Sequence, residues 1–172
     1  NMDIYMVVLR LIHFFASIFW VGAGFLLIGF ITPTVRALGK DGQTFMKGFV
    51  TQSKFTQAMP VASISTTITG LLLYYSVSDH FNSDWMSSAA GVVLTIGSVA
   101  GVLATLHGIF DTGPTTSRLA ALGKQLEAQG GPPSEAQMAQ LRTLQAKNAR
   151  ASQISLVLMI IAVIGMASAR YM

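Results

Sequence analysis

Between Leu9 and Pro33 the chain reads LRLIHFFASIFWVGAGFLLIGFITP, a stretch that is apolar almost throughout. About 20 such residues are enough for a helix to cross the hydrocarbon core of a bilayer. The composition agrees, because 52% of the 172 residues are hydrophobic and only 10% are charged, whereas about 25% of the residues of a soluble domain are charged. The sequence therefore predicts an all-α membrane protein that forms one domain over residues 1–172.

Four apolar segments are long enough to cross a membrane, which predicts a four-transmembrane-helix bundle. Pro33 is expected to end the first span, and the run from Asp111 to Pro114 is expected to end the third, because proline interrupts the helical hydrogen-bond ladder. We expect the four spans at about residues 5–31, 55–77, 86–110 and 151–170.

Residues 115–150, between the third and fourth spans, are expected to form a helical hairpin that projects into the cytoplasm. The run from Gly130 to Pro133 breaks its first helix. Ser134 followed by Gln137 is a capping-box pattern that starts a second helix. Because no breaker follows before the last span, we expect this second helix to continue into the membrane.

Lysine and arginine are distributed unevenly over the connecting segments. Four lie within residues 34–54 and five within residues 115–150, whereas none lies between the second and third spans. Basic connections stay in the cytoplasm, so we expect both termini on the outer side of the inner (plasma) membrane of a bacterium. The net charge of +4 is too modest to indicate nucleic acid, so the lipid bilayer is the expected partner. The chain has no cysteine, which excludes disulfides, thiolate metal sites and a cysteine nucleophile.

The first span carries polar residues that lipid alone would not select. His13, Ser17, Trp20 and Gly24 follow one another at i, i+4, i+7 and i+11, which places them in one stripe along a helix face, and Arg10 leads the stripe. An ionisable side chain in hydrocarbon is costly without a partner. We therefore interpret this helix as the wall of a functional site.

The second span is rich in hydroxyl groups, and the third is rich in small residues. Gly97 and Gly101 form a small-xxx-small pair, which favours close contact between helices. The hydroxyl groups of the second span can bond to a neighbouring helix, so we expect this span inside the bundle. They belong to Ser63, Ser65, Thr66, Thr67 and Thr69.

His13 is the first candidate ligand, since neutral imidazole suits haem iron, copper and zinc. Arg10, one turn away, could bind a haem propionate through two hydrogen bonds, and Trp20 could pack against a porphyrin. His80, expected at a similar depth in the turn after the second span, is the candidate for a second ligand. The alternatives are structural: a histidine bonded to neighbouring hydroxyls, an arginine anchored at the interface, and an aromatic ring that fills a helix contact.

His107 is the second candidate ligand. Asp111 follows four residues later on the same helix face, and a carboxylate that orients an imidazole is typical of metal sites. Met59 is expected at the same level and could complete a His/Met haem site. The alternative is a histidine that stabilises the end of its helix. His13 is expected near the start of the first span, and His107 near the end of the third span, which runs parallel to the first. Their levels in the membrane therefore differ by about 20 helical residues, or roughly 25–30 Å along the membrane normal. They cannot share one metal or one haem.

The first span resembles that of the copper-resistance CopD-like membrane family. The similarity rests on His13, on Trp20 seven residues later, on Gly22 and Gly24, and on Pro33. The same His-then-Trp spacing resembles the HemJ-type protoporphyrinogen oxidases, which are membrane proteins of four to five helices. In that family the third helix often contains a lysine that serves haem together with the histidine, whereas this chain has no lysine within residues 55–123.

The resemblance and the candidate ligands lead to two cofactors and three functions. The leading expectation is a haem b-binding membrane protein that works in electron transfer or in haem-related oxidation, as an oxidoreductase similar to protoporphyrinogen oxidase. The alternatives are a CopD-like copper-handling protein and a non-catalytic subunit or scaffold of a membrane complex. The nine methionines are scattered, without the clustering that a copper relay needs. The sequence leaves open whether the chain forms a homodimer or a larger complex.

Overall fold

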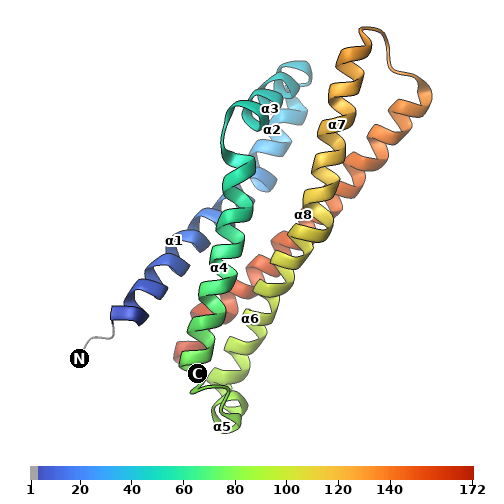
Figure 1. Cartoon of the computed structure of the whole chain (residues 1–172). Coiled ribbons are helices and arrows are strands. Elements are labelled where there is room, and N and C mark those ends of the chain that lie inside the picture. Colours follow the sequence, from blue (N-terminus) through green and yellow to red (C-terminus); the bar gives the residue numbers. More distant parts are fainter. Residues whose placement is uncertain (1–3) are drawn as a thin grey trace.

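The structure, a computed structural model, describes residues 4–172 (Figure 1). It is 91% helical, and the described residues contain no strand. This confirms the prediction of an all-helical chain with four apolar helices that could span a membrane. Among the residues described, these long helices are Ile4–Ala37, Phe55–Val77, Ala89–Gln129 and Glu135–Tyr171.

The long helices are composed of shorter elements, because the helical geometry changes along them. In chain order the elements are α1 (Ile4–Leu26), the π-turn η1 (Leu27–Ile31), α2 (Thr32–Ala37), α3 (Lys40–Gln52), α4 (Phe55–Val77), α5 (Ser83–Ser87), α6 (Ala89–His107), the π-turn η2 (Gly108–Thr112), α7 (Gly113–Gln129), α8 (Glu135–Ser168) and the short 3₁₀ turn η3 (Ala169–Tyr171).

The predicted helix ends at the two prolines are wrong. The first helix runs through Pro33 into α2, and the third runs through Pro114 into α7. A π-turn precedes each proline: in η1 the backbone N–H of Thr32 bonds to the carbonyl of Leu27, five residues back, and η2 has the same pattern. A wider turn accommodates a residue that has no N–H and whose ring crowds the preceding turn. Both helices therefore extend beyond their apolar segments.

The start of the third span also differs from the prediction. The chain first forms α5, whose N-cap Asn82 accepts hydrogen bonds from the backbone N–H groups of Asp84 and Trp85. It then restarts at Ser88, whose hydroxyl accepts a hydrogen bond from the backbone N–H of Gly91. Two successive N-caps explain this break, since each cap satisfies the free N–H groups of a new helix. Met86, expected to begin the span, lies in α5.

The predicted end of α7 and the predicted start of α8 are confirmed. Gly130 ends α7 in the left-handed conformation, with a φ of 66°, which glycine adopts without steric cost. Ser134 and Gln137 form the predicted capping box at the start of α8. From there α8 runs without interruption to Ser168, and its first half lies beside α7, where the Thr116 hydroxyl donates to the Asn148 side chain.

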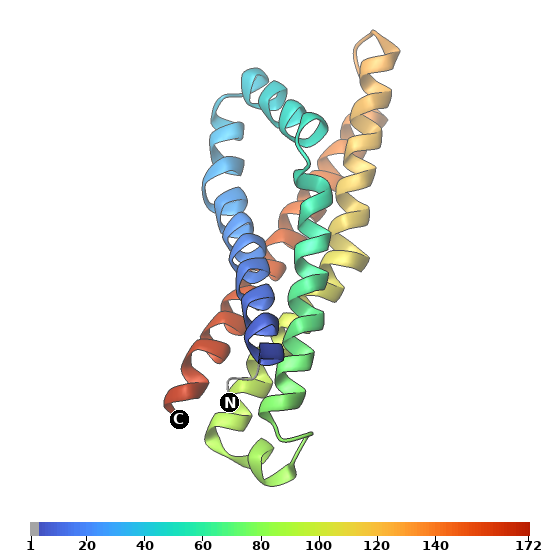
Figure 2. The ribbon, with the colours of Figure 1, turned by 60° about the vertical axis from the view of Figure 1, so that its left-hand side comes forward.

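The four long helices associate as two pairs, α1 with α4 and α6 with α8 (Figures 1 and 2). The two pairs contact each other less extensively, mainly through α4 and α6. Hydrogen bonds connect α4 and α6 at two levels: Thr67 to Thr105 at 2.6 Å, and Tyr74 to Thr95 at 2.5 Å. The predicted interior position of the hydroxyl-rich second span agrees with these contacts.

The α6–α8 pair crosses at glycine, as the small-residue pattern predicts. Gly97 lies against Gly165 so closely that a Cβ atom added at Gly165 would lie 2.7 Å from the Cα atom of Gly97. One turn further along α6, Gly101 faces Met166 and Ala162. Small residues allow the two backbones to approach, which increases the packing contacts between helices in a membrane.

α3 connects the two helices of the first pair. It runs obliquely across the end of the α1–α4 pair (Figure 2). A series of phenylalanine contacts holds it there, because Phe49 packs on Phe45 and Phe55, and Phe55 packs on Phe19. This predicted connecting segment is therefore an ordered amphipathic helix at one end of the bundle.

Candidate functional site

The predicted stripe of the first span is the face of α1 that packs against the other helices. His13 and Ser17 are half-buried, and Trp20 and Gly24 are buried. Arg10 lies at the exposed edge of the same helix and forms no ion pair or hydrogen bond with the described residues. The stripe therefore contributes His13 and Trp20 to the interior, whereas Arg10 remains outside it.

His13 is held by the backbone of α4. Its Nδ1 atom lies 2.9 Å from the carbonyl oxygen of Thr66 and 3.3 Å from the hydroxyl of Thr69. A carbonyl oxygen can only accept, so Nδ1 carries the proton and donates it. In the neutral imidazole the lone pair is then on Nε2, which is the arrangement found in many metal-binding histidines.

Gly70 makes this position of the ring possible. A Cβ atom at residue 70 would lie 2.8 Å from Cε1 of His13, a distance that side chains essentially never reach. The imidazole therefore occupies the space that any other residue at position 70 would fill. Ser17, one turn after His13, donates a hydrogen bond from its hydroxyl to the His13 carbonyl of the same helix. Among the described residues, the Ser17 hydroxyl therefore makes no hydrogen bond to another helix.

His13 borders a cavity of about 30 Å³ between the long helices. All four long helices contribute to its walls, so the cavity exists only in the assembled bundle. From α1 come His13 and Trp20, from α4 Thr66, Thr67, Gly70 and Leu71, from α6 Ser98, Gly101 and Val102, and from α8 Met166.

Two residues that line this cavity, Thr66 and His13, each have a side-chain polar atom without a hydrogen-bond partner among the described residues. The Thr66 hydroxyl is the buried side-chain oxygen that lacks a partner. The Nε2 atom of His13, whose side chain is half-buried, is the second, because both hydrogen bonds of this ring are made by Nδ1. Buried polar groups are normally paired, so the unpaired hydroxyl of Thr66 indicates that this cavity can hold something polar or cationic.

His80, the predicted second ligand on this side, lies elsewhere. It is in a turn of three consecutive residues with positive φ, Asp79 to Phe81. Its ring packs edge-on against Tyr75 at 4.6 Å, and its Nδ1 lies 3.4 Å from the Asp79 carboxylate. The side chain is 66% exposed. This turn directs His80 outward, and it does not border the cavity of His13.

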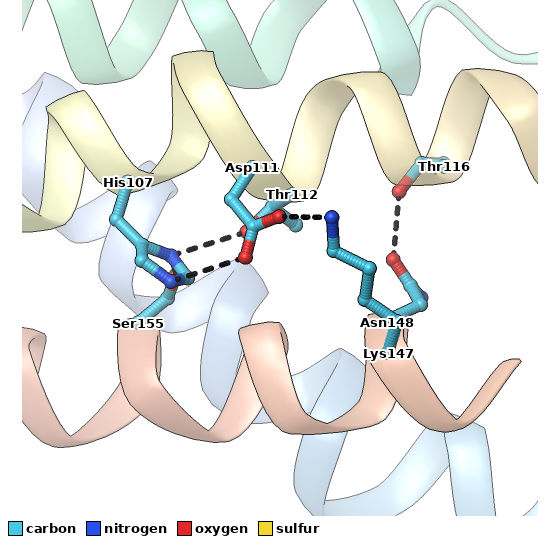
Figure 3. Close-up of polar contacts among 7 residues, drawn as sticks. All are labelled: His107, Asp111, Thr112, Thr116, Lys147, Asn148 and Ser155. Atoms are coloured by element: carbon cyan, nitrogen blue, oxygen red, sulfur yellow. Dashed lines mark hydrogen bonds and ion pairs between the residues drawn. The ribbon is translucent and has the colours of Figure 1, made fainter. Parts of the chain in front are cut away.

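His107 lies in a second polar network, between α6 and α8 (Figure 3). Its Nδ1 is 3.2 Å from the Ser155 hydroxyl and 3.4 Å from that of Thr112, and its Nε2 is 3.5 Å from the Asp111 carboxylate. Lys147 of α8 forms an ion pair of 2.9 Å with the other oxygen of Asp111. The predicted pairing of His107 with Asp111 is therefore present, and both ring nitrogens have partners.

The charges of this network balance one another. Asp111 follows the apolar part of its helix, which ends at Phe110, and the hydrogen bond from Lys147 lowers the pKa of its carboxyl below the ordinary value. An ammonium group that already occupies the carboxylate competes with any metal ion. Met59, the predicted partner of His107, instead packs against the buried cluster of Trp20, Ala62, Ala104 and Met159. The network therefore acts as a structural connection between α6 and α8.

The chemistry of the His13 cavity fits a single ion better than a porphyrin. A volume of about 30 Å³ corresponds to that of one water molecule, whereas pockets for organic ligands measure about 300–1,000 Å³. No carboxylate borders the cavity, and the described residues contain no group of three or more His, Cys, Asp or Glu side chains that could hold a metal ion. The available donors are imidazole nitrogen, thioether sulfur and hydroxyl oxygen. Haem b at His13 thus remains a prediction, since a cavity of about 30 Å³ has no space for a porphyrin.

The residues that sequence reasoning missed are those that distant helices contribute. Met166 was one of nine scattered methionines, and Gly70 and Ser98 carried no signal of their own. The hydroxyl-rich pattern did include Thr66, but it did not show that the Thr66 hydroxyl lacks a hydrogen-bond partner.

Comparison of the chain with protein-family models, with curated proteins and with solved structures found no match.

Proposed function

We propose that this protein is a multi-pass membrane protein that handles copper, with one copper(I) ion bound per chain in the His13 cavity. The proposal rests on the arrangement of His13: Nδ1 donates to the Thr66 carbonyl, Nε2 keeps its lone pair, and the residue lines a cavity of ion size. When the hydrogen bond of one ring nitrogen already fixes the orientation of a histidine, the ring loses little conformational freedom as its other nitrogen binds a metal.

The other cavity residues support a soft, singly charged ion. Met166 lines the same cavity from α8, and thioether sulfur prefers copper(I) over harder cations. Trp20 adds an aromatic ring, which attracts a cation electrostatically. Since no carboxylate borders the cavity, a divalent ion would bring two uncompensated charges into the apolar bundle, whereas copper(I) brings one.

The membrane arrangement is part of the same proposal. Because basic connections stay in the cytoplasm, we propose that α3, α7 and the first half of α8 lie in the cytoplasm of a bacterium, with α7 and α8 as a helical hairpin and both termini outside. This orientation and the resemblance of the first span to the CopD-like family agree with a role in copper movement or tolerance at the inner membrane.

A competition titration tests the copper site. Purified protein receives copper(I) in competition with a chromogenic copper(I) chelator, and we expect about one ion per chain. Met166→Leu, which preserves volume, should weaken binding because it removes the sulfur. Met159→Leu is the matched control, since Met159 packs against Gly24 and does not line the cavity. A stoichiometry well below one, or equal effects of the two substitutions, would refute the proposal.

Haem b is the second candidate, favoured by the modest contact between the two helix pairs. If the α1–α4 pair separated from the α6–α8 pair, His13 could become an axial ligand and Trp20 could pack on the ring. The visible spectrum after haem-replete expression decides: a Soret band that His13→Ala removes supports haem. If the protein binds neither cofactor and a stable partner co-purifies with it from native membranes, the scaffold function is supported.

A further inference from the structure

α3 combines an apolar face with an excess of positive charge. Phe45, Met46, Phe49 and Val50 lie on one side of this helix, and Lys40 and Lys47 lie on the opposite side. Arg36 just before it and Lys54 just after it add two further cations, and Asp41 is the one acidic residue of the segment 34–54. A helix of this kind is typical of the boundary between hydrocarbon and lipid headgroups.

The level of the bilayer follows from the exposed apolar residues of the neighbouring helix. Phe30, at the end of the first apolar segment, is 68% exposed, and Leu38 in the turn before α3 is 56% exposed. Exposed apolar side chains of a spanning helix contact lipid, so the hydrocarbon reaches at least to Phe30. α3 begins ten residues later and packs back against α2, where Gly42 lies in close contact with Val35. It therefore lies at the edge of the hydrocarbon.

The apolar side of α3 is not fully covered by the rest of the protein at Phe45. It is 54% exposed, although its ring stacks on Phe49 at 6.1 Å. Lys47 forms an ion pair with Glu127 of α7, whereas Arg36, Lys40 and Lys54 have no acidic partner among the described residues. An exposed aromatic ring beside unpaired cations is complementary to a surface that offers acyl chains below and negative charge above.

We propose that α3 and its flanking cations form a binding surface for anionic phospholipid headgroups, with Phe45 inserted among the acyl chains and Arg36, Lys40 and Lys54 on the lipid phosphates. This surface is separate from the copper site, so either proposal can fail alone. Anionic lipids attract basic segments within about one Debye length of the membrane.

Because the chain has no cysteine, single nitroxide labels can be placed without background. The full chain is labelled at Phe45→Cys or, on the polar face of α3, at Thr44→Cys, and reconstituted into phosphatidylcholine vesicles or into an equimolar mixture with phosphatidylglycerol. Collision rates with oxygen and with a water-soluble nickel chelate report the depth of each label. We expect the label at residue 45 to favour oxygen several-fold over that at residue 44, and to move deeper in the anionic vesicles.

Charge variants identify the groups responsible. Lys40→Gln with Lys54→Gln should abolish the deepening in anionic vesicles, whereas Lys124→Gln with Arg142→Gln removes the same charge from α7 and α8 and should preserve it. In the unmodified chain, the thermal unfolding midpoint should rise with the phosphatidylglycerol fraction and fall again with added salt. Equal depth for the two labels, equal behaviour in both lipids, or equal effects of the two charge variants would overturn the proposal.

Discussion

Both helix pairs have a glycine at their contact, but the space left by the missing side chain is filled differently in each pair. In the α6–α8 pair, Gly97 admits the backbone of Gly165, and the helices touch directly. In the α1–α4 pair, Gly70 admits the imidazole of His13. The first arrangement maximises packing, whereas the second positions an ionisable ring in the bundle. The same residue type therefore indicates stability in one pair and a site in the other.

The histidines of the two pairs differ in the same way. His107 has partners on both ring nitrogens, including the Asp111 carboxylate, which Lys147 neutralises. His13 has hydrogen-bond partners on one nitrogen only, and the residue lines a cavity. A histidine in a polar network is satisfied by the protein itself, and a histidine with an unpaired nitrogen has capacity for a ligand. An unpaired ring nitrogen is thus a better indication of a ligand site than the number of polar groups around the histidine.

Exchange of each histidine for alanine gives the largest expected contrast. His13→Ala should lower copper(I) affinity more than about 100-fold, since loss of a group that merely orients a ligand already costs about 10–100-fold. His107→Ala should leave the affinity within about twofold, because its ring lies in the separate network. Competition titration against the copper(I) chelator measures both. Equal losses in the two variants would show that the contrast between the histidines is mistaken.

Gly165→Ala tests the packing role of the second pair. A Cβ atom 2.7 Å from the Cα of Gly97 must push two backbones apart, and overpacking of this kind costs about 1–3 kcal/mol. We expect a lower thermal midpoint in detergent. Gly101→Ala is the control, because its Cβ would be 3.6 Å from the flexible end of Met166. Similar midpoints for the two variants would contradict direct glycine contact.

Gly70→Ala tests the positioning role of the first pair. The added methyl displaces the His13 ring, and loss of an orienting contact lowers metal affinity by about 10-fold or more. Gly22→Ala is the matched control, since nothing lies within 4 Å of a Cβ at that position of α1. Copper titration and thermal unfolding together separate the two roles. If Gly70→Ala binds copper as the unmodified protein does, the glycine serves packing alone.

The smallest effect is expected in the His107 network. The pKa of Asp111 is lowered by the hydrogen bond from Lys147, so its contribution to stability is complete above the unfolded-state value of about 4 and decreases as the pH falls through the lower folded-state value. Asp111→Asn should therefore lower the unfolding midpoint slightly at pH 7, and the difference should disappear in acid. A constant difference down to pH 3 would exclude the ion pair as its source.

Hydrophobic patterning predicted the four long helices, and local capping patterns predicted the turn at Gly130 and the start of α8. The predicted helix ends at Pro33 and Pro114 were wrong because a π-turn before each proline lets the helix continue, and the sequence does not distinguish such a proline from one that ends a helix. Of the predicted site residues, His13 and Trp20 share a cavity, whereas Arg10, His80, His107 and Met59 lie outside it.

The sequence by itself determined that the chain forms long apolar helices and that His13 lies on the packing face of the first, because spacing along one helix decides which residues share a face. Only the tertiary structure decided which nitrogen of His13 is left unpaired and that Met166 lies at the same cavity. These contacts join residues that are more than 50 and 150 positions apart. They depend on how helices cross, and helix crossing is set by side-chain shape at the interface.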